Sequence, residues 1–313
     1  MYKKTGMMYG ESNQLSSKRI PKTMEMEAGL IKNELVRKIL VPVDYSQNSL
    51  QALNSAMHLA EKFDAAIVLL HVFHTPFADE HMPAEMVKDM IESQKMISEK
   101  EMIAFWESNC MPFAQTVQFT HKTIMGFAAE SIRDIAIAEN CDLIMMGTRG
   151  GNSLQDKLFG TVTWNIIKNS KIPVIAIPEH TKFDEIKKIM MPFEGNLQDL
   201  ETLDYLLEFS EKFEAEVHAV NFMIDNTHNK SFTDKLQQRF RKKIENDKLQ
   251  LYYLSEKNIT EGIRKFAQKN NMDMICMITH THGLLSTIFH MSITRNIALY
   301  SEIPLLAYNA DKQ

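Results

Sequence analysis

Apolar and polar residues alternate along the chain in blocks of two lengths. The short blocks are apolar runs bounded by polar residues, such as Arg37 to Val43, and they predict strands buried on both faces. The longer blocks carry apolar residues at helical spacing, such as Leu50, Leu53 and Met57, and they predict amphipathic helices. Strands and helices therefore alternate, which is the pattern of a parallel sheet covered by helices.

This pattern occurs twice. Arg37 to Val43 (RKILVPV) returns as Lys187 to Phe193 (KKIMMPF), and the residues after each run stay in step without a gap. Asp142 to Met146 returns in the same way as Asp273 to Met277, and only the middle segment differs in length. The sequence therefore predicts a tandem of two copies of one domain.

Two stretches outside the repeat set the domain boundaries. Residues 1–35 lack hydrophobic periodicity and predict a flexible lead-in, within which Met24 to Glu34 is suited to a short helix. The link Pro178 to Asp184 is a break of a few residues, which favours two closely packed domains. We therefore place the domains at residues 36–180 and 184–310.

Each copy predicts the element order β-α-β-α-β-α-β-α-β. After the opening strand and its helix, the expected strands and helices are Ala66–Phe73, Ala84–Glu107, Thr116–Thr120, Ile124–Glu139 and Ile172–Ile177 in the first copy, and Glu216–Phe222, Thr233–Asp247, Gln250–Leu254, Ile259–Asn270 and Ile303–Tyr308 in the second. Because crossovers between parallel strands are right-handed, each copy should be a doubly wound α/β domain, an open five-stranded parallel sheet with helices on both faces. Such sheets bind ligands at their carboxyl edge, where the loops after the first and fourth strands meet.

The loop after the fourth strand of the first copy carries the strongest motif. Gly147, Gly150 and Gly160-Thr161 have the form G-x2-G-x9-G-[ST]. Glycines without a Cβ let backbone N–H groups approach phosphate oxygens, and a helix start adds its own N–H groups and dipole. The motif predicts a binding site for a polyphosphate, and the simpler alternative is a tight loop between a strand and a helix.

Joined to the strand end Val41-Pro42-Val43-Asp44, this motif resembles the universal stress protein family in its tandem form, and the resemblance extends from Arg37 to Asn309. It implies the adenine nucleotide α-hydrolase-like fold with strand order 3-2-1-4-5, and ATP as the cofactor, with or without Mg²⁺. The nucleotide contacts that it implies are Pro42, Val43, Asp44, Val72, Met146, Gly147, Arg149, Gly150, Gly160, Thr161, Val162 and Thr163. Arg149 departs from the family, whose members often carry His there, but a guanidinium can pair with phosphate oxygens.

The resemblance also implies how the two copies meet. In the family the final strands pair across a dimer, and such edge strands need covering. Here Ile172–Ile177 and Ile303–Tyr308 are therefore expected to pair with each other, which would make the chain an intramolecular pseudo-dimer. Further homodimerisation and the identity of a protein partner stay open.

The second copy lacks the glycines of this binding site. It has Ile278, Thr281 and Met291 in place of Gly147, Gly150 and Gly160, keeps hydroxyls at Ser292 and Thr294, and carries Glu194 in place of Asp44. Because bulkier side chains fill the space for phosphate, we expect ATP in the first copy only. Asp44 has a second interpretation, as the cap of the helix that starts near Ser46 or Asn48.

Composition and charge exclude several classes of function. The balance of 35 Lys+Arg against 40 Asp+Glu leaves a net charge of −5, which gives nucleic acid little to bind. No apolar stretch approaches the roughly 20 residues needed to cross a bilayer, so neither a membrane protein nor a secreted one is expected. The cysteines, Cys110, Cys141 and Cys276, form no CxxC pair, which favours the reducing cytoplasm.

Catalytic and metal-binding motifs are weak. No G-x-S-x-G, HExxH or GxxxxGK[ST] sequence occurs, so we expect a binding protein rather than an enzyme. His280, His282 and His290, with Glu194, offer a zinc site as the alternative to solvated loop histidines, but paired ligand motifs are missing.

The sequence thus predicts a cytoplasmic universal stress protein that binds ATP in its first domain and acts in stress response or signalling. One alternative is a nucleotide-independent interaction module or chaperone-like protein. The other is a slow ATPase or self-phosphorylating protein, with Thr161 and Thr163 as the hydroxyls nearest the expected γ-phosphate.

Overall fold

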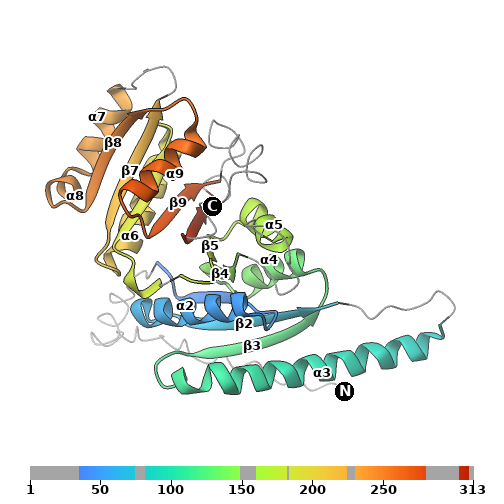
Figure 1. Ribbon diagram of the computed structural model, residues 1–313. Helices are drawn as coiled ribbons and strands as arrows, with labels where there is room; N and C mark the ends of the chain where they lie inside the picture. Colours follow the sequence, from blue (N-terminus) through green and yellow to red (C-terminus); the bar gives the residue numbers. More distant parts are fainter. Residues whose placement is uncertain are drawn as a thin grey trace, which may run out of the picture. The chain divides into compact units, whose positions relative to one another are not determined.

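The computed structural model describes residues 35–74, 82–148, 160–181, 183–223, 230–279 and 303–309, which belong to one compact unit (Figure 1). Except for Leu35, the predicted lead-in and its suggested helix lie outside these residues. Within the described part of the chain, no helix combines the length and the hydropathy that crossing a membrane requires.

Both copies alternate strands and helices as predicted. The first copy contains β1 (Lys38–Pro42), α2 (Gln47–Phe63), β2 (Ala66–Phe73), α3 (Ala84–Asn109), the 3-10 helix η1 (Met111–Phe113), β3 (Phe119–Met125), α4 (Ala128–Ala138), β4 (Leu143–Gly147), α5 (Thr161–Asn169) and β5 (Val174–Ile177). The second contains the 3-10 helix η2 (Phe183–Glu185), β6 (Lys188–Phe193), α6 (Leu197–Glu211), β7 (Glu216–Met223), α7 (Lys230–Arg239), α8 (Arg241–Glu245), β8 (Leu249–Ser255), α9 (Ile259–Lys269), β9 (Met274–Ile278) and β10 (Leu305–Tyr308).

The strands form one ten-stranded sheet in the order β3-β2-β1-β4-β5-β10-β9-β6-β7-β8. Within each copy the neighbouring strands are parallel and the order is 3-2-1-4-5, which confirms the predicted doubly wound α/β fold. The final strands β5 and β10 pair antiparallel, with Ile175 opposite Leu306, as expected. The two copies therefore share a continuous sheet.

Side chains of β1 enter two separate cores because successive residues of a strand point to opposite faces of the sheet. Val41 belongs to the core that also contains residues of α2 and α3. Leu40 belongs to the core on the other face, with Ile132 of α4 and residues of α5. The first core continues into the second copy, where the ring centroids of Phe63 and Phe209 are 5.4 Å apart.

One hydrogen-bonding arrangement occurs in both copies and explains part of the repeat. Asp142 Oδ2 accepts hydrogen bonds from the backbone amides of Arg37 and Lys38 at 2.9 and 3.1 Å, just where β1 begins. Asp273 Oδ2 does the same for the two residues that open β6, at 2.9 Å each. These carboxylates fix the amino ends of the first and fourth strands of each copy side by side.

Two elements of the first copy are shifted from their predicted positions. The strand expected at Thr116–Thr120 is β3 at Phe119–Met125, and the helix expected from Ile124 begins at Ala128. The middle of β3, His121 to Thr123, is polar because β3 is the edge strand of the sheet. Without an apolar run in that segment, the pattern placed the strand too early.

The helix predicted over Thr233–Asp247 is two helices in the structure, α7 and α8. Phe240 separates them, with φ −105° and ψ 17°, and its side chain is only 4% exposed. The helix is therefore interrupted at Phe240, where the ring is buried.

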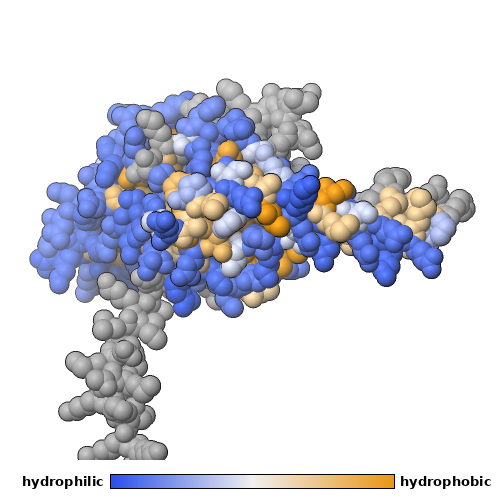
Figure 2. Space-filling model, turned by 90° about the horizontal axis from the view of Figure 1, so that it is seen from below, coloured by the Kyte–Doolittle hydropathy of each residue, from blue (hydrophilic) through white to orange (hydrophobic). Residues whose placement is uncertain are grey.

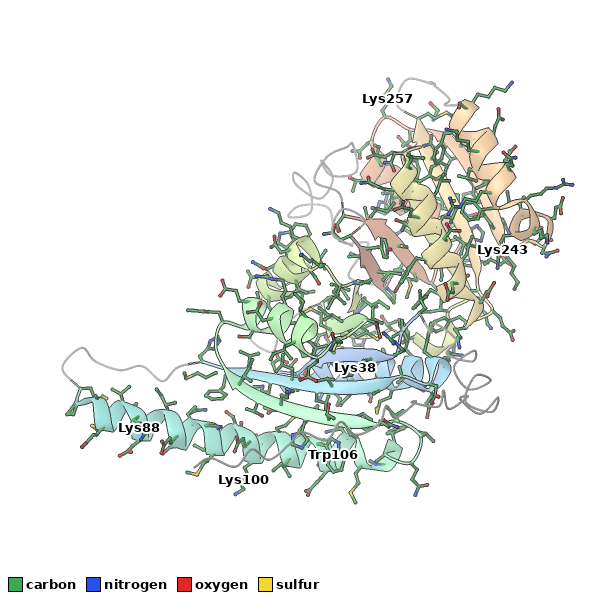
Figure 3. All side chains as sticks on the ribbon, turned by 180° about the vertical axis from the view of Figure 1, so that it is seen from behind. Lys38, Lys88, Lys100, Trp106, Lys243 and Lys257 are labelled. Atoms are coloured by element: carbon green, nitrogen blue, oxygen red, sulfur yellow. The ribbon has the colours of Figure 1, made fainter. Side chains whose placement is uncertain are left out.

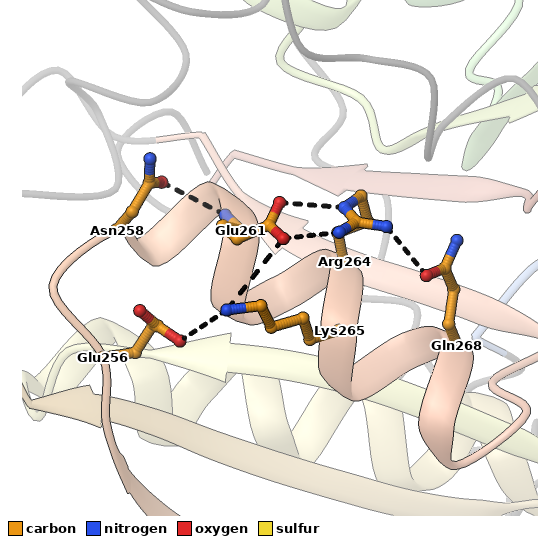
Figure 4. A network of polar contacts seen from close by, with 6 residues as sticks. All are labelled: Glu256, Asn258, Glu261, Arg264, Lys265 and Gln268. Atoms are coloured by element: carbon orange, nitrogen blue, oxygen red, sulfur yellow. Dashed lines mark hydrogen bonds and ion pairs between the residues drawn. The ribbon is translucent and has the colours of Figure 1, made fainter.

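Helix α9 shows how a polar outer face and a buried inner face combine. Asn258 accepts a hydrogen bond from the amide of Glu261 at 3.1 Å and so caps the helix, while Arg264 pairs with Glu261 and Lys265 with Glu256 (Figure 4). Pairing with Arg264 lowers the pKa of Glu261. The opposite face of α9 enters the core with Ile263 at 0% exposure.

Candidate functional site

The ends of β1 and β4 lie at the same edge of the sheet, where the nucleotide was predicted. Val43 follows β1 and its amide donates to the carbonyl of Leu70 in β2, at 2.8 Å. Gly147 ends β4, and the next amide, of Thr148, donates to the carbonyl of Ile177 in β5, at 3.0 Å. Both predicted loops therefore start from firmly hydrogen-bonded strand ends.

Gly147 allows a close approach that any side chain would prevent. A Cβ at this position would lie 2.8 Å from the backbone oxygen of Asn48 and 3.0 Å from its Cβ, in the first turn of α2. Contacts below 3.0 Å to backbone atoms require the structure to shift. This glycine thus has a structural role, because it lets the end of β4 reach the start of α2.

The glycine-rich loop begins and ends at one place. The amide of Gly160 donates to the carbonyl of Thr148 at 2.7 Å, and the hydroxyl of Thr163 donates to the carbonyl of Gly147 at 2.9 Å. Arg149 and Gly150 lie outside the described residues. Thr163 is 3% exposed, and its hydrogen bond to Gly147 stabilises the closed loop. Of the two threonines at the start of α5, only Thr161 is exposed.

Helix α5 starts at this loop without a side-chain cap. Gly160 is its N-cap residue and offers no side chain, and the first backbone bond within the helix runs from the amide of Trp164 to the carbonyl of Gly160 at 3.0 Å. The amides of Thr161, Val162 and Thr163 therefore have no acceptor within the helix. Such a helix start, with its dipole, favours an anion.

Asp44 is exposed and supports the cap of α2 rather than making it. Its Oδ1 accepts hydrogen bonds from the amide of Ser46 at 3.1 Å and from the hydroxyl of Ser46 at 2.5 Å. The Ser46 hydroxyl in turn accepts from the amide of Ser49 at 3.2 Å, which makes Ser46 the N-cap. Asp44 therefore does not cap α2 itself, as the alternative interpretation had it. It accepts hydrogen bonds from Ser46, and Ser46 is the cap.

Tyr45, which the sequence did not single out, connects this loop to α3. It has φ 63°, in the left-handed region, and its ring stacks on His71 with centroids 4.5 Å apart. The Phe105 ring of α3 lies 5.2 Å away, and His71 Nδ1 is 2.8 Å from the carbonyl oxygen of Val43. Burial, and secondarily the charge of Glu101, raises the pKa of Tyr45.

The remaining predicted contacts differ in what they can offer a ligand. Val72 lies near the end of β2, half-buried and paired with Ile124 of β3. Pro42 is half-buried at the end of β1. Met146 is 5% exposed and packs in the core, so its side chain serves the fold and only its backbone lies along the strand end.

The repeat, the fold and the loop geometry agree with a comparison of sequences. A model of the universal stress protein family matches residues 36–178 and again residues 185–309. The chain belongs to the universal stress protein family. It is 31% identical over 149 residues to a universal stress protein of Methanocaldococcus jannaschii, a match that covers 47% of this chain and 85% of that protein. It is 29% identical over 162 residues to the stress response protein NhaX of Bacillus subtilis, covering 45% and 96%.

Solved structures extend this likeness to both copies together. A universal stress protein from Archaeoglobus fulgidus superposes with a TM-score of 0.64 at 16% identity, covering 87% of this chain and 96% of that chain. A protein of Pseudomonas aeruginosa does so with a TM-score of 0.58 at 14% identity, covering 88% and 92%. These structures share the fold of the tandem universal stress protein chain.

In the second universal stress protein domain, the chain's own carboxylate occupies the loop after the first strand. Asp199 is 2% exposed, and its Oδ2 accepts hydrogen bonds from the amides of Glu194, Gly195 and Asn196 at 3.1, 2.7 and 2.8 Å. Asn196 Oδ1 accepts from the amide of Asp199 at 2.9 Å, which completes a capping box. The same position in the first domain holds Ser49.

Asp199 was not predicted from the sequence, because an aspartate at a helix start is common and its hydrogen bonds depend on the fold of the backbone. The second loop of the degenerate site, with His280, His282 and His290, lies outside the described residues. Among the residues that the structure describes, no three His, Cys, Asp or Glu side chains gather as metal ligands would.

Proposed function

We propose that the first domain binds ATP at the carboxyl ends of β1 and β4, and that the chain acts in the cytoplasm as a stress-response or signalling protein. Membership of the universal stress protein family supports a stress-response role. The observation that supports nucleotide binding is the convergence of Gly147, Gly160 and the uncapped start of α5. The three cysteines are buried free thiols, which suits a reducing compartment.

The proposed geometry divides the nucleotide between two sets of groups. The amides of Thr161 and Val162, with the exposed Thr161 hydroxyl, would hold phosphate oxygens at the start of α5. The exposed Asp44 carboxylate and the half-buried Val72 would face the adenosine from the ends of β1 and β2. We propose no ATP in the second domain, because Ile278, Thr281 and Met291 replace the three glycines of the phosphate loop.

We propose a binding protein rather than an enzyme. Of the two hydroxyls nearest the expected γ-phosphate, that of Thr163 is buried and donated to the carbonyl of Gly147. Only Thr161 is then placed to accept a phosphoryl group, and the sequence carries no recognised catalytic motif that would remove its proton. Incorporation of labelled phosphate at Thr161 would reverse this assignment.

The test is ATP binding by the full chain, measured by calorimetry and by thermal shift with and without Mg²⁺. ATP at about 100 times its dissociation constant should add about 2.7 kcal/mol to the free energy of unfolding. Asp44→Asn and Thr161→Val should each weaken binding about tenfold, because each removes one polar contact worth about 1.4 kcal/mol.

The matched control is Glu194→Gln, the same change at the corresponding position of the second domain. It should leave ATP binding unchanged. Failure of wild-type chain to bind ATP at millimolar concentration, or equal losses from Asp44→Asn and Glu194→Gln, would contradict the proposal.

A further inference from the structure

Helix α3 buries little of its own length. Of its 26 residues, from Ala84 to Asn109, only Ser98 and Met102 are buried, and both lie in the carboxyl-terminal half. In Figure 3 Trp106 lies on the side of α3 that faces β3, and Lys100 lies on the side that faces away. The helix therefore has one face committed to its own domain and another turned outwards.

The outward face carries a regular apolar seam. Met86, Met90, Ser93, Ile97, Lys100 and Ala104 follow one another at alternating steps of four and three residues. This is the spacing by which two helices pack side by side over several turns, here about 27 Å. Met86 is 54% exposed and Ile97 52% exposed, so the seam is not covered by the domain itself.

Two further apolar residues border the seam. Met96 is 65% exposed and Ile103 46% exposed, and they lie seven residues apart on the same helix. Figure 2 shows hydrophobic residues among hydrophilic ones over the region of α3. Met86, Met96, Ile97 and Ile103 are thus large apolar side chains that are each at least 46% exposed on one helix, and such a gathering at a surface indicates a protein contact.

We propose that this seam binds the seam of a second copy of the chain, with the two α3 helices antiparallel. The seam is complementary to itself in that direction. Met86 of one copy meets Ala104 of the other, and Ser93 meets Ile97, so these layers pack a large side chain against a small one, while in the remaining layer Met90 meets Lys100. Met96 then lies beside Met96 of the second copy, at the two-fold axis.

Charge favours the same arrangement. Lys100, within the seam, comes next to Asp89 of the second copy, and the two-fold axis makes this pair twice. A parallel pair would instead place Lys100 beside Lys100 and Asp89 beside Asp89, which like-charge repulsion disfavours. The antiparallel second copy is therefore the occupant that both the size pattern and the charges select.

This association uses a different part of the molecule from the β5–β10 junction and does not depend on nucleotide. Sedimentation velocity on the full chain should show a reversible dimer. Ile97→Lys should raise its dissociation constant at least about tenfold, because a charge placed in the seam must lose its water. Ile137→Lys is the matched control, since Ile137 is 55% exposed on α4 and lies outside the seam.

Two further measurements define the register. Met96→Cys should form an intermolecular disulfide under mild oxidation, whereas Met86→Cys should not, because it faces Ala104. The native cysteines are buried, which keeps the background low. Asp89→Lys and Lys100→Asp should each weaken the dimer, and the double variant should restore it.

A chain that stays monomeric at about 100 µM would overturn the proposal, because the contact should have a dissociation constant below that concentration. So would a dimer that Ile97→Lys leaves intact, or a disulfide from Met86→Cys, which indicates a parallel pair. A monomer in which Ile97→Lys increases proteolysis within residues 1–34 would assign the seam to the chain's own amino-terminal segment, and would overturn it too.

Discussion

His218 is a histidine whose burial opposes its protonation. It lies in the middle of β7 at 4% exposure, with its ring stacked on Tyr252 at 5.6 Å between centroids. Loss of solvent lowers the pKa of His218, and Lys188 on the neighbouring strand lowers it further. Glu216, whose Oε2 lies 3.4 Å from Nε2, raises the pKa but does not outweigh the burial. The folded protein therefore keeps this ring neutral at a pH where the unfolded chain would charge it.

The consequence is acid sensitivity. A histidine whose pKa is lowered by folding stabilises the fold fully above its unfolded pKa of about 6.5, and this stability is lost as the pH falls below that value. One such group contributes a slope of at most about 1.4 kcal/mol per pH unit. Urea unfolding at a series of pH values below 7 should show this slope in wild type, and His218→Phe should reduce it.

His58→Gln serves as the control, because His58 is exposed on α2 and its loss should leave the slope unchanged. Equal slopes in wild type and His218→Phe would show that other groups, rather than this ring, cause the acid sensitivity.

At the scale of elements, the loop from β6 to α6 shows how one side chain can hold the backbone that follows a strand. Three consecutive amides point at Asp199 Oδ2, and Gly195 adopts φ 100° to allow it. In the first domain Tyr45 takes the corresponding left-handed position and Ser49 replaces the aspartate. In the first loop the amide of Ser46 donates to Asp44 instead, at 3.1 Å.

Removing the internal anion should destabilise the second domain. Asp199→Ala leaves three half-buried amides without their charged acceptor and removes half of the capping box, so we expect a loss of about 3 kcal/mol in the free energy of unfolding. Asp199→Asn keeps an acceptor oxygen without its charge and should lose about half as much. Chemical denaturation followed by far-UV circular dichroism measures both.

Asp204→Ala, on the same helix, is the control, because its carboxylate pairs with Arg239 at the surface and should contribute at most about 1 kcal/mol. A loss from Asp199→Ala no greater than from Asp204→Ala would mean that the three hydrogen bonds contribute little.

The sequence predicted these elements unevenly, for physical reasons. β2 was predicted to the residue because most of its residues are buried and only His71 interrupts its apolar run. β3 was predicted too early in the chain because an edge strand carries polar residues. α7 and α8 were predicted as one helix because the burial of Phe240 depends on tertiary packing. Helical and strand periodicity in the sequence reflect which residues are buried. They predict an element poorly where only one of its faces is buried or where burial of a single side chain interrupts it.

The candidate site was predictable to a similar degree. Gly147 and Gly160 could be placed together because a strand end and the following helix start are close in any doubly wound fold. The stack of Tyr45 on His71 and Phe105 could not, because it joins residues that only the folded chain brings together. Asp199 was missed because hydrogen bonds to backbone amides leave no pattern in the sequence.

At the scale of the molecule, the β5–β10 pairing joins the two copies through one sheet and through the cores on both of its faces. Leu306 is fully buried opposite Ile175, and the core on that face of the sheet includes residues of both copies. A loss of packing at this junction should therefore destabilise both domains. Both tryptophans, Trp106 and Trp164, belong to the first copy, so their fluorescence reports that copy alone.

We expect the two copies to unfold as one cooperative unit. Fluorescence and far-UV circular dichroism should give coincident transitions, and Leu306→Ala, in the second copy, should lower the fluorescence midpoint through a cavity that costs about 2–5 kcal/mol. Leu249→Ala removes an equally buried leucine from β8, at the far end of the sheet. If the sheet couples the whole chain, both variants should shift the fluorescence transition. If the copies share only the junction, Leu306→Ala should shift the transition and Leu249→Ala should not. An unchanged fluorescence midpoint in both variants would show that the copies unfold independently despite their common sheet.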